Sequence, residues 1–259
     1  MVGGTTLSYR DSHRRPGYGR YYERTYEHGY YAEQWRRIER PLLAGMLREL
    51  HDHGARSLLD FACGTGRILE LAETIFDDTW GVDVSATMQE LARERCPRST
   101  LRLQDITEEP LPRRFDVVTA FRFFLNAEEP LRRRVLRAIE ASLEPGGVLI
   151  ANVHVSSTSP VGWFYRARSH LRPAKRAKTL SLSAFGITIE TMGLRVLEVR
   201  RYGYMPRPGP LLPGLAGRLV EPIERLCEAT PLVPASLAQS FLVVCGREGE
   251  EPRWRGSGR

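Results

Sequence analysis

Residues 58–67 read Leu-Leu-Asp-Phe-Ala-Cys-Gly-Thr-Gly-Arg, and this stretch decides the fold. An apolar run ends at an acidic residue, Asp60, and a turn containing Gly64 and Gly66 follows it. From Arg67 onward the apolar residues have helical spacing. Strand, tight glycine turn and helix form the opening unit of a nucleotide-binding α/β domain, in which glycine lets the backbone bend sharply and approach a ligand.

The details of this turn distinguish between classes of cofactor. Leu69 occupies the position of the third glycine in a dinucleotide-binding fingerprint, which disfavours a nicotinamide or flavin cofactor. The carboxylate of Asp60 would repel a pyrophosphate and attract a cationic group such as an ammonium. A dehydrogenase is therefore the least favoured function.

The same run closely resembles the first motif of the class I S-adenosylmethionine-dependent methyltransferases. Further segments resemble the later motifs of that family, in the same order, at 80–85, 103–106, 115–126 and 143–153. The resemblance covers residues 35–155 well and extends more loosely through 193–199 and 240–246. It implies an α/β fold with a Rossmann-like, seven-stranded, mostly parallel sheet and helices on both of its faces.

The resemblance also implies that S-adenosylmethionine binds at the carboxyl ends of the strands. Asp83 ends the next strand, where a carboxylate can accept both ribose hydroxyls. Asp105 would accept a hydrogen bond from the adenine amino group, with Ile106 against the ring. The complete predicted set of cofactor-binding residues is Asp60, Ala62, Gly64, Gly66, Asp83, Val84, Asp105, Ile106 and Phe121.

For the acceptor, the sequence favours a small molecule that is methylated on oxygen rather than on nitrogen or carbon. His154 directly follows the fifth strand and is the candidate base for deprotonating a hydroxyl. Candidate substrate contacts are Tyr31, Arg122 and Phe123. Residues 121–124 read Phe-Arg-Phe-Phe and lack the Asn-Pro-Pro-Tyr-like element that enzymes acting on planar exocyclic amines have at this point.

The chain is expected to form one domain at residues 21–247, between disordered tails at 1–20 and 248–259. Residues 21–54 are predicted to form an N-terminal helical lid. Two long insertions, 155–180 and 203–236, would lie on the substrate side of the sheet after strands five and six. The aromatic and basic residues of the first insertion suit an anionic or carrier-bound acceptor, although a solvated arginine-rich surface loop is the slightly favoured explanation.

Composition limits the remaining functions. A chain of 259 residues with 42% hydrophobic residues can bury a sizeable core, and none of its apolar runs reaches the length of about 20 residues that a membrane helix needs. We therefore expect a cytoplasmic protein. Its four cysteines are widely spaced, so neither a metal site nor a disulfide framework is indicated.

The basic residues do not point clearly to a nucleic-acid partner. The net charge is +7, but the arginines are scattered and no recognition module is visible. A nucleic-acid partner is therefore disfavoured. The alternatives that remain are an RNA or protein methyltransferase and a non-catalytic module that binds the cofactor. The sequence leaves the oligomeric state open.

Overall fold

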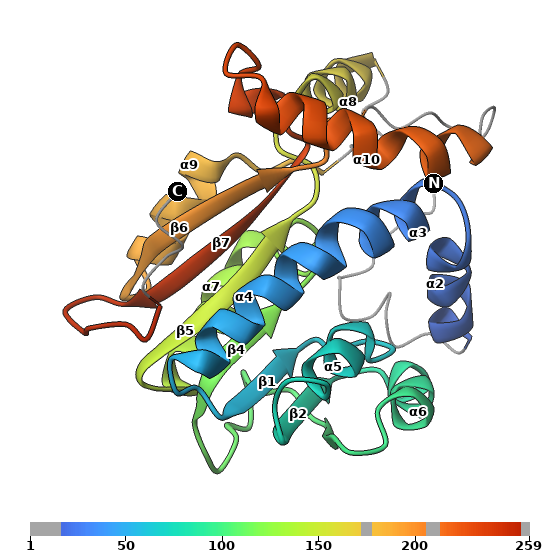
Figure 1. Ribbon diagram of the computed structural model, residues 1–259. Helices are drawn as coiled ribbons and strands as arrows, with labels where there is room; N and C mark the ends of the chain where they lie inside the picture. Colours follow the sequence, from blue (N-terminus) through green and yellow to red (C-terminus); the bar gives the residue numbers. More distant parts are fainter. Residues whose placement is uncertain (1–16, 172–177, 206–212, 255–259) are drawn as a thin grey trace, which may run out of the picture.

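The structure, a computed structural model, describes residues 17–171, 178–205 and 213–254 (Figure 1). Seven strands form one sheet in the order β3-β2-β1-β4-β5-β7-β6. Strands β1 to β5 pair in parallel, and β7 runs antiparallel to both β5 and β6. This confirms the predicted seven-stranded, mostly parallel sheet. The strands are β1 (Ser57–Phe61), β2 (Asp78–Asp83), β3 (Thr100–Leu103), β4 (Phe115–Ala120), β5 (Leu143–Val153), β6 (Leu194–Tyr202) and β7 (Ser240–Arg247).

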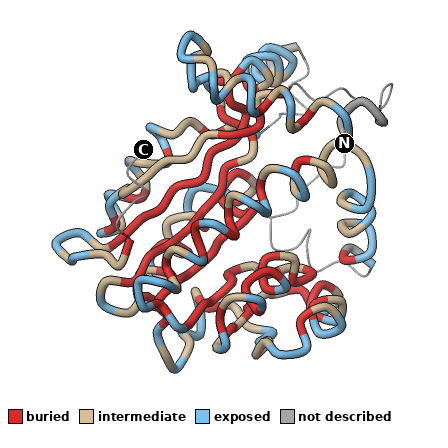
Figure 2. The backbone as a smooth tube through the Cα atoms, in the orientation of Figure 1, coloured by how far each residue is buried: buried red, intermediate tan, exposed pale blue. Residues whose placement is uncertain are grey.

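Helices cover both faces of the sheet because neighbouring residues of each central strand point to opposite sides. Leu58 packs with the helices α4 (Arg40–Asp52) and α5 (Arg67–Ala72), and α4 lies along this face in Figure 1. Leu59 packs with α7 (Glu129–Ala141) and α9 (Leu182–Glu190) on the other face. The central strands are accordingly buried along their whole length (Figure 2). Helices on both faces of the sheet are what the family resemblance implied.

The N-terminal segment consists of α2 (Tyr18–Glu27), α3 (Tyr30–Gln34) and a π-helix, η1 (Trp35–Glu39), that continues into α4. Helix α2 contacts α6 (Ala86–Arg95), and α3 and η1 contact α10 (Pro213–Ala229). Helical structure thus begins at Tyr18, inside the predicted tail at 1–20, and the role of residues 21–54 as a lid stays a prediction. Residues 1–16 of that tail lie outside the described residues.

Each predicted insertion contributes one long helix. Helix α8 (Pro160–Leu171) belongs to the first, and α10 with the short 3-10 helix η3 (Ala235–Leu237) belongs to the second. Residues 172–177 and 206–212 lie outside the described residues. Across the part of the chain that the structure covers, no helix combines the length and the apolar character needed to cross a bilayer.

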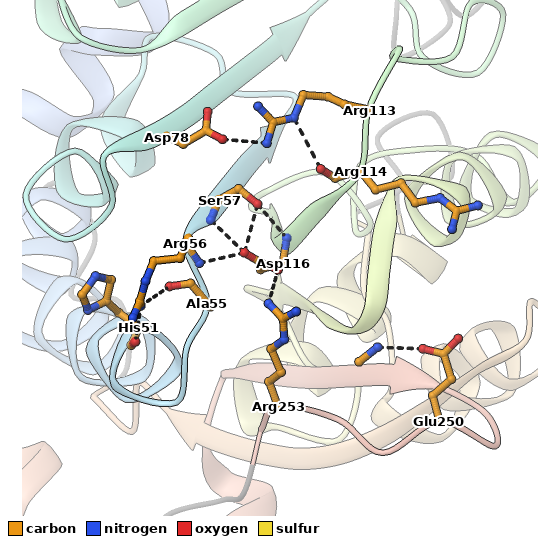
Figure 3. Close-up of polar contacts among 11 residues, drawn as sticks. His51, Ala55, Arg56, Ser57, Asp78, Arg113, Arg114, Asp116, Glu250 and Arg253 are labelled. Atoms are coloured by element: carbon orange, nitrogen blue, oxygen red, sulfur yellow. Dashed lines mark hydrogen bonds and ion pairs between the residues drawn. The ribbon is translucent and has the colours of Figure 1, made fainter.

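The carboxylate of Asp116 links the amino ends of β1 and β4 through hydrogen bonds (Figure 3). Its Oδ2 accepts hydrogen bonds from the backbone amides of Arg56 and Ser57, at 2.7 and 3.0 Å, and the Arg253 guanidinium bonds to Oδ1. Trp254 is also buried, and its indole donates to Glu198 at 2.8 Å. The expected disorder of 248–259 therefore does not extend to Arg253 and Trp254, because these two side chains pair with carboxylates of the folded domain.

Candidate functional site

Two hollows of about 420 and 440 Å3 lie at the carboxyl ends of the parallel strands and share Ala62. The first hollow has charged and aromatic walls, which include Tyr22, Trp35, Glu39, Asp60, Arg67 and Phe121. The second hollow is largely apolar, with two carboxylates at its edge, and its walls include Phe61, Val82, Asp83, Asp105, Phe123 and Leu131. The two hollows are neighbours and together make the candidate site, at the edge of the sheet where open α/β folds bind ligands.

The glycine turn forms the floor of the first hollow. Gly64 has a φ of 56° and Gly66 a φ of 82°, so both adopt the left-handed conformation that side chains disfavour. A Cβ on Gly66 would also lie 2.7 Å from Cys96 Sγ. The turn therefore requires glycine at both positions that the sequence analysis singled out.

The close packing that a third glycine would provide is supplied from the neighbouring strand. Leu69 packs so tightly against Gly81 of β2 that a Cβ on Gly81 would lie 2.5 Å from Leu69 Cδ1. In the dinucleotide fingerprint the third glycine allows close helix–strand packing. Here the helix carries Leu69 at that position, and the glycine that allows close packing, Gly81, lies on the strand. The departure from the dinucleotide fingerprint is in this way compatible with close helix–strand contact.

Two non-glycine residues in the first hollow have positive φ angles. Ala62 follows β1 with a φ of 54°, and Arg122 follows β4 with a φ of 59°. Such conformations cost on the order of 1–3 kcal/mol and persist where the surroundings fix them. Here the Arg122 amide donates to Asn152 Oδ1 at 2.6 Å, which holds the chain in its turn beside the hollow.

Asp60 carries a buried carboxylate oxygen that no described residue satisfies. The side chain is 1% exposed, and its Oδ1 accepts a hydrogen bond from Thr119 Oγ1 at 2.7 Å. Its Oδ2 is buried and has no hydrogen-bond partner among the described residues. Burial raises the pKa of Asp60 to about 7, although the hydrogen bond from Thr119 acts to lower it. An ammonium group in the first hollow would satisfy Oδ2 and favour the charged carboxylate.

Asp83 and Asp105 bring acceptor oxygens to the second hollow. Asp83 accepts from the backbone amides of Gly64 and Ser85, both at 2.8 Å, while burial raises its pKa. Each carboxylate oxygen has more than one lone pair and can also accept from a hydroxyl. Asp105 Oδ1 accepts from the amide and hydroxyl of Thr107, at 3.0 and 2.8 Å, which fixes its orientation at the hollow.

Most of the sequence-predicted residues meet at the two hollows. Asp60, Ala62, Gly64, Phe121 and Arg122 line the first, and Ala62, Asp83, Val84, Asp105 and Phe123 line the second. Gly66 shapes the turn, and Ile106 is buried in the adjoining core.

Two further predicted residues, Tyr31 and His154, are not among the lining residues. The ring of Tyr31 meets Tyr30 edge-on at 5.7 Å, and His154 directly follows β5. Their predicted roles with the acceptor stay predictions.

The guanidinium of Arg122 is engaged by Glu39. Its Nη2 lies 2.6 and 2.7 Å from the two carboxylate oxygens, and Tyr202 also donates to Glu39 at 3.1 Å. The nearby Glu39 helps to raise the pKa of Arg122 despite the desolvation of the guanidinium. This buried pair links η1 to the segment that follows β4. The predicted contact of Arg122 with the substrate stays a prediction.

Sequence reasoning missed the residues that the N-terminal segment contributes to the first hollow. Helix α2 is held against the glycine turn, since Glu23 bonds both Thr65 Oγ1 and, at 2.6 Å, Arg95 Nη2. Tyr22, Trp35 and Glu39 then complete the wall. The family resemblance implied a lid at 21–54, but it did not indicate which aromatic rings of that segment face the hollow.

Comparisons with known proteins agree with this geometry. Residues 58–147 match a family model described as a methyltransferase domain. The dTDP-4-amino-2,3,4,6-tetradeoxy-D-glucose N,N-dimethyltransferase of Saccharopolyspora spinosa is 37% identical over 99 residues, which are 37% of this chain and 39% of that protein. The dTDP-3-amino-3,4,6-trideoxy-alpha-D-glucopyranose N,N-dimethyltransferase of Streptomyces venezuelae is 42% identical over 99 residues, which are 37% of this chain and 41% of that protein. The match thus spans less than half of either relative.

A solved structure shares the fold over nearly the whole chain. It is magnesium protoporphyrin IX methyltransferase from Synechocystis PCC 6803 with bound SAH, which covers 92% of this chain and 97% of its own length with a TM-score of 0.65. The sequence identity is 14%, so this similarity concerns the fold.

Proposed function

We propose that this chain, which carries a class I S-adenosylmethionine-dependent methyltransferase domain, transfers methyl groups to the amino nitrogen of a nucleotide-linked amino sugar. The observation that carries the choice of acceptor is the similarity of a 99-residue stretch of this chain to each of two sugar N,N-dimethyltransferases. The sequence pattern alone favours oxygen, so this proposal departs from it on the reacting atom and keeps its small-molecule class.

The residues of the two hollows suit S-adenosylmethionine, whose sulfonium supplies an activated methyl group. The orphaned Oδ2 of Asp60 fits the cofactor's ammonium, and Arg67 in the same hollow offers positive charge for its carboxylate. Asp83 and Asp105 offer acceptors for the ribose hydroxyls and the adenine amine. The two hollows meet at Ala62, which is where the amino-acid and nucleoside halves of one ligand would join.

The chain's own task in the reaction is then to position the acceptor and exclude water. Correct alignment of two reactants can contribute about 7–11 kcal/mol in favourable cases. Helix α2, tied to the glycine turn through Glu23, shields one side of the first hollow. Among the described residues that line the hollows there is no histidine. A neutral amine carries its own lone pair and needs no such base at the moment of attack, which supports nitrogen as the acceptor atom.

The test is a matched pair of acceptors offered to the full chain with S-adenosylmethionine. One is a dTDP-linked sugar that carries an amino group, and the other is the same sugar with a hydroxyl at that carbon. We expect mass spectrometry to show one and then two added methyl groups on the amino sugar alone. Methylation of only the hydroxyl analogue, or of neither acceptor while calorimetry shows that the cofactor binds, would contradict the proposal.

A further inference from the structure

The guanidinium of Arg67 lies within a cluster of three aromatic rings. Its Cζ is 3.4 Å from the centroid of the Tyr26 ring and 5.5 Å from the centroids of both Tyr22 and Trp35. Tyr22 and Trp35 also line the first hollow, together with Arg67 itself. The three rings come from α2 and η1, so the N-terminal segment brings them to the start of α5.

Arg67 differs from the other arginines around this hollow in how its charge is balanced. Arg122 pairs with Glu39 at 2.6 Å and Arg95 pairs with Glu23 at 2.6 Å. The direct contacts of the Arg67 guanidinium are the faces of the three rings, while its charge acts at longer range on the carboxylates of Glu23 and Asp60. A cation held in this way can leave without breaking an ion pair, and the site that it leaves is suited to another cation.

We propose that Tyr22, Tyr26 and Trp35 form a cation box that binds the alkylammonium group of the acceptor, with Arg67 occupying the box until the carboxylate of the bound cofactor draws it away. The inference rests on the proposed amine-methylating function and adds the residues that recognise the amine. Ring faces attract organic cations by about 0.5–2 kcal/mol, and aromatic cages commonly recognise methylated ammonium groups.

The box lies beside the hollow in which we expect the sulfonium of the cofactor and the nitrogen of the acceptor to meet. Methyl transfer shifts positive charge from sulfur to nitrogen, and the ring faces favour positive charge in either place. The acceptor amine first loses its proton to solvent, and the N–C bond then forms as the S–C bond breaks. The methylated product is again a cation, which the same three rings can hold. An uncharged hydroxyl acceptor gains nothing from the box, so these residues would select amines.

A binding experiment tests the box without relying on turnover. Choline and its uncharged isostere 3,3-dimethyl-1-butanol are titrated into the full chain saturated with S-adenosylhomocysteine, and binding is followed by calorimetry. We expect choline to bind about 10-fold more tightly than the isostere, as cation–π attraction predicts. Equal affinities for the two probes would overturn the proposal.

Paired variants separate the ring faces from a general loss of structure. Tyr26→Phe keeps the face and should retain choline affinity within about twofold, whereas Tyr26→Leu and Trp35→Leu should lose most of the preference for choline. Each variant is first checked for S-adenosylhomocysteine binding, which shows that the domain is folded. Choline binding that survives both leucine substitutions would overturn the proposal, as would equal losses in Tyr26→Phe and Tyr26→Leu.

Arg67→Met tests whether the arginine competes for the box. This variant should bind choline in the absence of S-adenosylhomocysteine, whereas the wild-type chain under the same conditions should bind it more weakly. Weaker choline binding in Arg67→Met than in the wild type would overturn the exchange of cations. Selective choline binding without methylation of the amino sugar would uphold the box and reject the proposed function, and methylation without choline binding would do the reverse.

Discussion

The two hollows of the site are built from different parts of the chain. Every residue named for the second hollow lies between 61 and 135, inside the segment 58–147 that matches the methyltransferase family model. The first hollow takes its floor and part of its walls from that segment and receives Tyr22, Trp35 and Glu39 from the N-terminal helices. One hollow is therefore local to a recognisable motif, and the other depends on how a distant segment docks.

The two hollows also differ in how their charges are balanced. Asp83 and Asp105 at the second hollow receive hydrogen bonds from nearby backbone amides. At the first hollow, Asp60 has an unsatisfied oxygen and Arg67 is held by rings. Asp116, at the opposite end of β4, shows the contrast. Burial would raise the pKa of that carboxyl, but the amides of Arg56 and Ser57 and the charge of Arg253 hold it below its ordinary value. The first hollow thus retains charges that a ligand can balance.

The largest effect on stability should come from breaking the buried Glu39–Arg122 pair, which attaches the N-terminal helices that form one wall of the first hollow. Glu39→Gln leaves the Arg122 guanidinium without its negative partner, and loss of one member of a buried pair costs about 3–5 kcal/mol of the free energy of unfolding. Urea denaturation measures this change.

The double variant Glu39→Met/Arg122→Met provides the control, since removal of both charges leaves none uncompensated. We expect it to recover most of the lost stability. Similar stabilities for Glu39→Gln and the wild type would mean that the pair does not attach the N-terminal segment.

The second prediction concerns opposite effects of Asp60→Asn on binding and stability. The substitution removes the carboxylate charge that we expect to pair with the ligand's ammonium. S-adenosylhomocysteine binding should therefore weaken by about 1.5–3 kcal/mol, roughly 10- to 100-fold, which calorimetry can measure. Asp78→Asn is the matched control, because Asp78 starts β2 in an exposed pair with Arg113 at 2.6 Å and lies far from the hollows along the strands. Its substitution should leave binding unchanged.

The size of the stability effect depends on pH. The pKa of Asp60 is about 7 in the folded protein, against about 3.9 in an unfolded chain. The folded state therefore holds this proton more tightly, and its contribution to stability is lost as the pH rises from about 4 to about 7. Asp60→Asn should match the wild type in thermal stability near pH 4 and exceed it increasingly toward pH 7. A constant difference across this range would show that the Asp60 carboxyl titrates normally.

The third prediction addresses the second hollow's supporting contact. In Gly81→Ala the new methyl group would meet Leu69 Cδ1 at 2.5 Å and Leu101 Cδ2 at 2.9 Å, and overpacking of this kind costs about 1–3 kcal/mol. Leu69→Ala alone opens a cavity and also destabilises the protein. The double variant Gly81→Ala/Leu69→Ala should lose less free energy of unfolding than the two single variants lose together. Strict additivity in urea denaturation would show that the two side chains do not compete for one space.

Gly81 and Leu69 also show what could be read from the sequence. The motifs at 58–67, 80–85 and 103–106 predicted the strand, the turn and the three aspartates, because each motif is a short run of neighbouring residues and the order of the motifs resembles that of the family. They did not predict that Gly81 compensates for Leu69, since that contact joins two elements across the sheet. The inward rings of Tyr22 and Trp35 were missed for the same reason, because helical periodicity does not say which side of a short lid helix meets a distant turn.

The smallest effect compares two helical glycines and tests whether the first hollow depends on close docking of α2. Gly45 in α4 is exposed and a Cβ there would have no atom within 4 Å, so Gly45→Ala should stabilise the protein by about 0.5–1 kcal/mol. Gly19 in α2 lies against α6, where a Cβ would be 2.7 Å from the carbonyl oxygen of Thr87. Gly19→Ala should therefore forfeit the same helical gain, speed proteolysis near α2 and weaken S-adenosylhomocysteine binding. If Gly19→Ala instead raised the melting temperature as Gly45→Ala does and left binding intact, the outer wall would not require this contact, and the two hollows would be equally independent of the N-terminal segment.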